Sequence, residues 1–175
     1  MIKKIIEYIK RNAPSLLVLA VLLLLKNKEG FGFTPLFIGA SGIYNRYKAN
    51  LMNRVVDMEA DTIYVMLLDN NHSFTATNDV IGDVSANEIT GTGYTANGTV
   101  LAGKAVTQAA TTKFDATDVA WTGATFTAYH AVLWDDTVAT DDLICSIDFG
   151  AAKSVSSGTF TIVWNANGIL TLATA

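Results

Sequence analysis

Residues 126–135 read FTAYHAVLWD, and this stretch decides the fold class. Its side chains alternate between two sets, which are Phe126, Ala128, His130, Val132 and Trp134 on one side and Thr127, Tyr129, Ala131 and Leu133 on the other. A period of two places neighbouring side chains on opposite faces of a strand, whereas a helix repeats every 3.6 residues. Aromatic and β-branched residues also favour strands. We therefore predict a long β-strand here.

Further strand patterns lie on both sides of this stretch. The segment DTIYVMLL at 61–68 is apolar on both faces, which is typical of a central strand covered on both sides. Other candidate strands are 99–106, 112–114, 118–121, 143–149, 159–164 and 169–173. The predicted loops are 70–82, 136–142 and 151–158. About eight short strands separated by turns predict an all-β domain of the β-sandwich or jelly-roll-like class.

Two Asn-Gly pairs mark predicted tight turns, because this dipeptide readily adopts positive φ. The pair Asn97-Gly98 precedes the 99–106 segment, and the pair Asn167-Gly168 should join 159–164 to 169–173 as a terminal hairpin. The glycine-rich string GTGYTANG at 91–98 lacks the Lys-Ser/Thr ending of a phosphate-binding loop. We interpret it as turns.

The N-terminal residues 1–43 have a different character and are predicted to form a basic, apolar, helical anchor. The segment IKKIIEYIKR at 2–11 places four isoleucines on one helical face. The run SLLVLAVLLLL from Ser15 to Leu25 would span roughly 16–17 Å as a helix, short of the ~30 Å core of a bilayer. Tyr44, Tyr47, Leu51 and Val55 then recur at helical spacing, which predicts a short amphipathic helix over 44–56 at the start of a 44–175 β-domain.

Several interpretations of the first 44 residues remain open. A cleaved signal peptide fits the basic start, but KNKE at 26–29 stands where small residues should precede the cleavage site. An uncleaved membrane-associated anchor and a helix buried in a protein assembly both fit the apolar run. A core helix of the chain's own domain fits less well, because the sequence that follows has β character.

Charge separates the same two parts of the chain. Residues 1–54 hold nine basic and two acidic residues, a net charge of +7, and the remainder holds three basic and fourteen acidic residues, a net charge of −11. Phosphate binding needs clustered Lys and Arg, so the acidic part is not expected to bind nucleic acid specifically. Cys145 is the only cysteine, which excludes an intrachain disulfide.

Four motifs together carry a resemblance to a known family. They are DVSANEITGTGYTANGTVLAGKAV from Asp83, FDATDVAWTGATFTAYHAVLWDD from Phe114, IDFG from Ile147 and FTIVWNANGILTL from Phe160. In order and spacing, the chain from about Tyr44 to Thr174 resembles small virion proteins of tailed bacteriophages, of the head-fibre, decoration or minor tail type. The resemblance implies a β-sandwich that decorates or joins a particle, without enzymatic activity. The apolar residues before Tyr44 depart from that family's pattern.

The sequence offers few groups for nucleophilic catalysis. His72 lies in a predicted loop and His130 in an aromatic strand, where a packed residue is more common than a general base. Cys145 lies in an apolar strand, where a free thiol is usually inert. A hydrolase built on a Cys145/His130 pair is therefore a minor alternative, and we assign no catalytic residues.

Acidic and aromatic residues provide the remaining candidate sites. Asp135, Asp136, Asp141 and Asp142 flank one loop and offer oxygen ligands for calcium, but their spacing does not match an EF-hand, so solvated surface charge is the favoured interpretation. Asp115 and Asp118 are expected in turn or capping roles. Trp121, Trp134 and Trp164 are expected in the core, with a sugar-binding face as the alternative. We predict no metal and no cofactor.

The sequence thus predicts a non-enzymatic virion structural protein, attached through its N-terminal segment. The expected partners are the major capsid protein or other virion proteins, further copies of the chain, and a lipid membrane contacted through residues 1–44. The expected location is the virion, in association with a viral or host membrane. The alternative is a receptor- or glycan-binding spike module.

Overall fold

The computed structural model describes residues 36–38 and 41–173. The chain divides into two compact units, Met1–Gly32 and Phe33–Ala175, and the first lies wholly outside the described residues. The predicted helix at 2–11 and the Ser15–Leu25 run therefore also lie outside them. Within the described part the fold is all-β, with nine strands, one α-helix and two short 3-10 helices.

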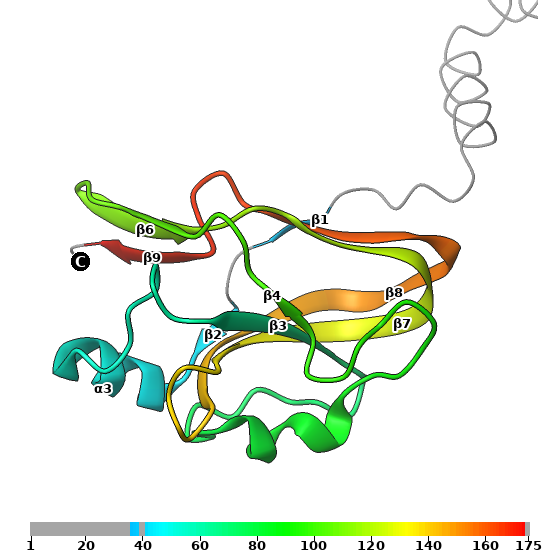
Figure 1. The fold of residues 1–175 in the computed structure, drawn as a ribbon, viewed down its shortest axis with the longest axis horizontal. Coiled ribbons are helices and arrows are strands. Elements are labelled where there is room, and N and C mark those ends of the chain that lie inside the picture. The colour runs from blue at the N-terminus through cyan, green and yellow to red at the C-terminus, as the bar shows by residue number, and fades with distance from the viewer. Residues whose placement is uncertain (1–35, 39–40, 174–175) are drawn as a thin grey trace, which may run out of the picture. The chain divides into compact units, whose positions relative to one another are not determined.

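A long antiparallel hairpin dominates the fold. Strand β7 (Val119–Asp135) pairs with β8 (Asp142–Trp164), and the loop 136–141 joins them. The pairing register shifts at four places, and Gly123 and Gly150 adopt positive φ within the strands. Irregularities of this kind bend a sheet. Figure 1 shows the hairpin curving so that its far end returns over the sheet.

The hairpin is the centre of the larger sheet, whose strand order is β1-β8-β7-β3-β4. Strand β3 (Ile63–Leu68) pairs with β7 along its whole length, and the short strand β4 (Thr99–Val100) lies outside β3. Strand β1 (Leu36–Ile38) pairs in parallel with one end of β8, and β2 (Gly42–Ile43) pairs antiparallel with the other. Residues 36–38 and 42–43 thus belong to the sheet, although the sequence suggested a β-domain beginning at Tyr44.

A smaller sheet has the order β5-β6-β9 and lies beside the first. It consists of β5 (Ala105–Thr107), β6 (Thr111–Asp115) and β9 (Leu170–Ala173). The predicted terminal hairpin is wrong, because β9 pairs with β6 and not with residues 159–164. The predicted strand 99–106 is also divided between the two sheets, as β4 and β5.

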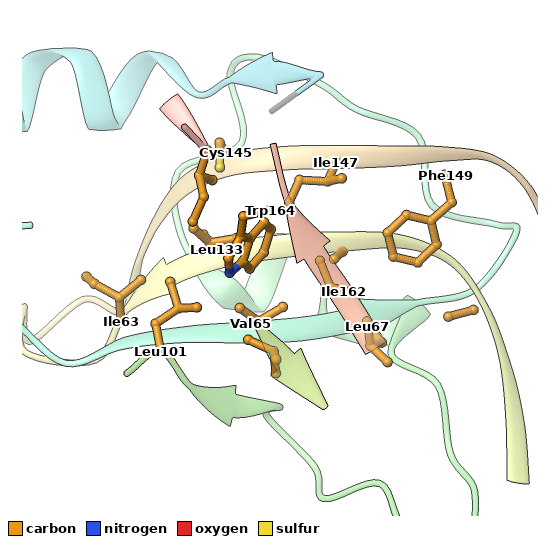
Figure 2. Packing of buried hydrophobic residues seen from close by; sticks show 14 of the residues in the cluster. Ile63, Val65, Leu67, Leu101, Leu133, Cys145, Ile147, Phe149, Ile162 and Trp164 are labelled. Atoms are coloured by element: carbon orange, nitrogen blue, oxygen red, sulfur yellow. The ribbon is translucent and has the colours of Figure 1, made fainter. Parts of the chain in front are cut away.

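The two faces of β3 contribute to two separate clusters of buried side chains. Ile63, Val65 and Leu67 belong to the inner cluster, which also contains side chains from the returning end of the hairpin, such as Ile162 and Trp164 (Figure 2). The outer cluster, on the opposite face, consists of Tyr44, Met66, Leu68, Val84, Val132, Trp134 and Leu143. The prediction of a strand covered on both faces is confirmed.

The predicted short helix is confirmed as α3 (Asn45–Asn53). Its Tyr47 and Asn50 side chains are buried, and Leu51 packs against the inner cluster. The helix ends at Arg54, which adopts the left-handed conformation. The segment 69–98 includes the 3-10 helices η1 (Ile81–Asp83) and η2 (Ser85–Asn87), which pack on the outer cluster through Ile81 and Val84. Later in the same segment, Ile89 and Tyr94 pack on the inner cluster.

The predicted loop 151–158 is wrong, because these residues form the middle of β8. Their small and polar composition resembles a loop, but they pair with β7, for example through Val155 with Phe126 and Lys153 with Ala128. The separately predicted strands 118–121 and 126–135 are likewise parts of β7, and 143–149 and 159–164 are parts of β8. Long-range pairing therefore determines these elements more strongly than local composition.

Candidate functional site

An open groove of about 540 Å³ lies at the β4 edge of the larger sheet. Tyr64 on β3 and Trp134 on β7 are direct cross-strand neighbours, and their rings stack with centroids 4.8 Å apart and planes inclined by 17°. Trp134 is buried, whereas Tyr64 is half-buried and lines the groove with it. On the other side of Tyr64, Val100 is 44% exposed. The floor of the groove is therefore an aromatic surface fixed by the sheet.

The turn 95–98 forms one wall, and hydrogen bonds hold it against β3. Glu88 Oε1 accepts hydrogen bonds from Tyr94 Oη (2.7 Å) and from the Asn97 backbone N–H (2.6 Å). Tyr94 Oη in turn accepts one from the Leu67 backbone N–H (3.0 Å). Burial, and further the contact with Glu88, raise the pKa of Tyr94, so the phenol keeps the proton that it donates. The Asn97 carbonyl accepts a hydrogen bond from Trp134 Nε1 (3.2 Å).

Backbone conformation fixes the same turn. Asn97 and Gly98 both have positive φ, as the Asn-Gly pair predicted, and the Gly98 N–H donates to the Thr95 carbonyl. A Cβ atom at Gly98 would overlap the Val65 carbonyl oxygen. The wall is thus in place before any ligand arrives, which lowers the entropic cost of binding.

Polar groups surround the aromatic floor. Thr95 and Asn97 are exposed on the wall, Thr99 is half-exposed, and Asp136 is exposed at the end of β7. Residues 41–173 contain six basic and fourteen acidic residues, so this surface belongs to a negatively charged domain. The groove therefore favours a neutral or cationic ligand over an anionic one.

The two histidines meet on the outer face of the sheet. Their ring centroids are 5.1 Å apart, and His72 Nε2 lies 3.2 Å from Ser146 Oγ. His130 Nδ1 lies 3.7 Å from Asp148 Oδ1. Burial, and then the neighbouring His130, lower the pKa of His72 and favour its neutral form. Ser146 is only 2% exposed, so these contacts hold the loop that carries His72 against the sheet and leave the hydroxyl enclosed.

Cys145 lies on the opposite face from the histidines. It belongs to the inner cluster, whereas the next residue, Ser146, contacts His72 on the outer face. Its side chain is fully buried, and burial raises the pKa of the thiol to about 12. The structure therefore does not bring together the Cys145/His130 pair considered from sequence.

The prediction that the acidic residues at the ends of the loop 136–141 are solvated surface charges is wrong for two of them. Asp135 and Asp142 are only 1% and 2% exposed. Asp142 accepts hydrogen bonds from Arg46 Nε (3.0 Å), Asn50 Nδ2 (2.6 Å) and Thr140 Oγ1 (2.6 Å), and so connects α3 to the loop. Asp136 is exposed. Within residues 36–38 and 41–173, no three or more His, Cys, Asp or Glu side chains gather as a metal site would require.

Burial in the core is confirmed for all three tryptophans, which are 3–5% exposed. Trp121 and Trp164 belong to the inner cluster, and Trp134 alone among them lines the groove. A local backbone contact, as expected in a turn, is found for Asp115, whereas Asp118 binds the backbone of a residue far away in the sequence and so has neither a turn nor a capping role. Asp115 accepts from the Ala116 N–H, and Asp118 from the Trp164 N–H.

Sequence reasoning missed the groove because its parts are far apart in the chain. Tyr64 and Trp134 are 70 positions apart and meet only through the pairing of β3 with β7. The Asn97-Gly98 turn was recognised, but its position over β3 depends on Glu88 and Tyr94, which have no local signature.

No protein-family model, curated protein or solved structure matches the chain. In the part of the chain that the structure describes, no helix is both long enough and apolar enough to cross a membrane.

Proposed function

We propose that the chain is a non-enzymatic structural protein of a tailed-bacteriophage virion. Its β-domain, of β-sandwich or jelly-roll-like type, would decorate the capsid or form part of a vertex or fibre, and its N-terminal segment would attach it. The observation that carries the proposal is the contrast between a basic, apolar N-terminal segment and an acidic β-domain in one chain. The motif resemblance between about Tyr44 and Thr174 supports the same assignment.

The chemistry of the β-domain is compatible with a structural role. Two nucleophile candidates on β8 are enclosed, since Cys145 is 0% and Ser146 2% exposed. The raised pKa of Cys145 keeps its thiol protonated, and a protonated thiol is a poor nucleophile. The buried polar contacts of Asp142 and His72 join separate elements of the fold.

The proposed partners follow from the charges and the symmetry of particles. The acidic β-domain would pack on the major capsid protein or other virion proteins, and copies of the chain would associate around a symmetry axis. The basic residues of the N-terminal segment would contact anionic lipid headgroups of a viral or host membrane, or an acidic site in the shell. Its negative charge makes the β-domain unsuited to binding nucleic acid specifically.

The proposal is tested on particles. Virions released from the host that carries this gene are purified on a density gradient, and the fractions are probed with antibodies raised against the chain. We expect the chain in the particle band, at a constant ratio to the major capsid protein. Its absence from that band would overturn the proposal. Detergent treatment of the same particles then separates two modes of attachment, because release together with lipid indicates a membrane and retention indicates a protein site.

One observation favours a second candidate function, a receptor- or glycan-binding module. The groove beside Tyr64 combines an aromatic floor with a polar rim. Such a module would still reside on the particle, so particle association does not separate the two functions. Direct ligand binding does.

A further inference from the structure

We infer that the groove between Tyr64 and the 95–98 turn binds a neutral hexopyranose, either free or as the terminal unit of a glycan. The inference goes beyond the structural role and does not depend on it, because a decoration protein need not bind sugar. It rests on the shape of the groove, the chemistry of its lining and the fixed position of its wall.

The floor matches the apolar face of a pyranose ring. Sugars such as galactose and glucose present C–H groups on one face of the ring and hydroxyls around its edge, and the C–H face packs well on an aromatic side chain. Tyr64 provides such a ring, and Trp134 stacks against it with centroids 4.8 Å apart. Trp134 is itself fixed, through its Nε1 hydrogen bond to the Asn97 carbonyl.

The rim matches the hydroxyls. A pyranose hydroxyl is both donor and acceptor, so it needs partners of both kinds. The rim supplies hydroxyls, an amide and one carboxylate, and its members are Thr95, Asn97, Thr99 and Asp136. The carboxylate forms the strongest of these contacts, because a hydrogen bond to a charged acceptor is stronger than one between neutral groups.

Charge disfavours anionic ligands, and the size of the groove suits a sugar. A nucleotide or a sialic acid would bring an anion beside Asp136 on an acidic domain. The volume of about 540 Å³ lies within the range usual for small-molecule sites and exceeds a single sugar ring, which leaves room for a glycosidic neighbour. The groove is open, so we expect weak binding of one ring, with a Kd in roughly the millimolar range.

The test uses the full chain in mild detergent, with three neutral probes and one anionic probe. The neutral probes are methyl β-D-galactopyranoside, methyl β-D-glucopyranoside and N-acetylglucosamine, and the anionic probe is N-acetylneuraminic acid. Saturation-transfer NMR detects binding, and titration gives the Kd. We expect at least one neutral probe to bind, with the strongest transfer to its ring C–H protons. We expect the anionic probe not to bind.

Two variants locate the site. Tyr64→Leu keeps an apolar side chain but removes the aromatic face, and it should weaken binding about tenfold or more. Asp136→Asn changes an exposed side chain with little risk to folding, and it should weaken binding by roughly three- to tenfold. The matched controls are Tyr129→Leu and Asp141→Asn, which lie outside the groove lining and should leave the Kd unchanged.

Three results would overturn the inference. The first is that no neutral probe binds at about 20 mM, which is well above the expected Kd. The second is that Asp136→Asn leaves the Kd of the neutral probe unchanged. The third is that the anionic probe binds as strongly as the neutral ones. Should Tyr64→Leu fail to fold, as judged by near-UV circular dichroism, Asp136→Asn decides the outcome. Particle association is measured separately, so loss of this inference leaves the structural proposal untouched.

Discussion

Asparagine in place of Asp135 should stabilise the protein at neutral and alkaline pH and leave it almost unchanged in acid. Asp135 is 1% exposed, and its Oδ1 accepts a hydrogen bond from the Thr137 backbone N–H (2.8 Å). Its Oδ2 is buried and receives no hydrogen bond. Asparagine keeps the acceptor at Oδ1 and places a neutral amide at the second position, so the substitution removes a charge with little change in shape.

The expected magnitude follows from the pKa. Burial first, and then the nearby carboxylate of Asp61, raise the pKa of Asp135 from its ordinary value of 3.8 to about 6. A shift of this size corresponds to about 3 kcal/mol. Because the folded pKa is the higher one, the stabilisation by the bound proton is complete below about pH 4 and is lost as the pH rises through 6. Above that range, the fold contains an unfavourable buried charge.

The assay is urea unfolding of the wild type and Asp135→Asn at pH 4, 6 and 8, with Asp136→Asn as the exposed neighbouring control. The variant should exceed the wild type by up to about 3 kcal/mol at pH 8, and the difference should vanish near pH 4. The control should have nearly the same free energy of unfolding as the wild type at every pH. The reasoning would be refuted if the difference in unfolding free energy between the variant and the wild type did not change with pH. It would also be refuted if the variant were less stable than the wild type at pH 8.

Three further substitutions test other parts of the fold by urea unfolding. Gly98→Ala should destabilise by about 3 kcal/mol or more, because the new Cβ would overlap the Val65 carbonyl; an unchanged midpoint would contradict this. Phe160→Ala should lower the free energy of unfolding by about 3–5 kcal/mol, because Phe160 is fully buried in the core. Leu172 is 59% exposed, so Leu172→Ala should lower it by less than about 1 kcal/mol, and equal losses would disprove the core assignment. His72 has a lowered pKa, so its stabilising effect is lost as the pH falls below about 6.5. His72→Gln should therefore lose less unfolding free energy between pH 7 and pH 5 than the wild type does. An equal loss in both proteins would contradict the lowered pKa of His72.

The spacing of apolar side chains along the chain predicted some strands and one helix. Strand β3 and the 126–135 part of β7 followed from their periodicity. Helix α3 followed from the spacing of Tyr44, Tyr47, Leu51 and Val55, although Tyr44 precedes the helix and Val55 follows it. Local signals of this kind depend on the chain within a few residues. Such elements could therefore be predicted from the sequence alone.

Pairing partners could not be predicted in the same way. Nothing local in Leu170–Ala173 distinguishes β6 from β8 as its neighbour, yet β9 pairs with β6. The segment 151–158 has the composition of a loop but is held in β8 by its register with β7. The same limit applies to the groove, whose floor and wall meet through strand pairing and through Glu88. Burial of Asp135 and Asp142 likewise depends on contacts with distant parts of the chain.

The position of the long hairpin in the chain has a consequence during synthesis. Only the loop 136–141 separates β7 from β8, so the contacts next to that loop, such as Asp135 with Asp142, are local in sequence, and local contacts form fastest. The strands that join them from the N-terminal side, β1, β2 and β3, close much longer loops and should dock later. Translation completes β8 only at Trp164. The apolar residues 15–25 are therefore synthesised well before the β-domain can fold.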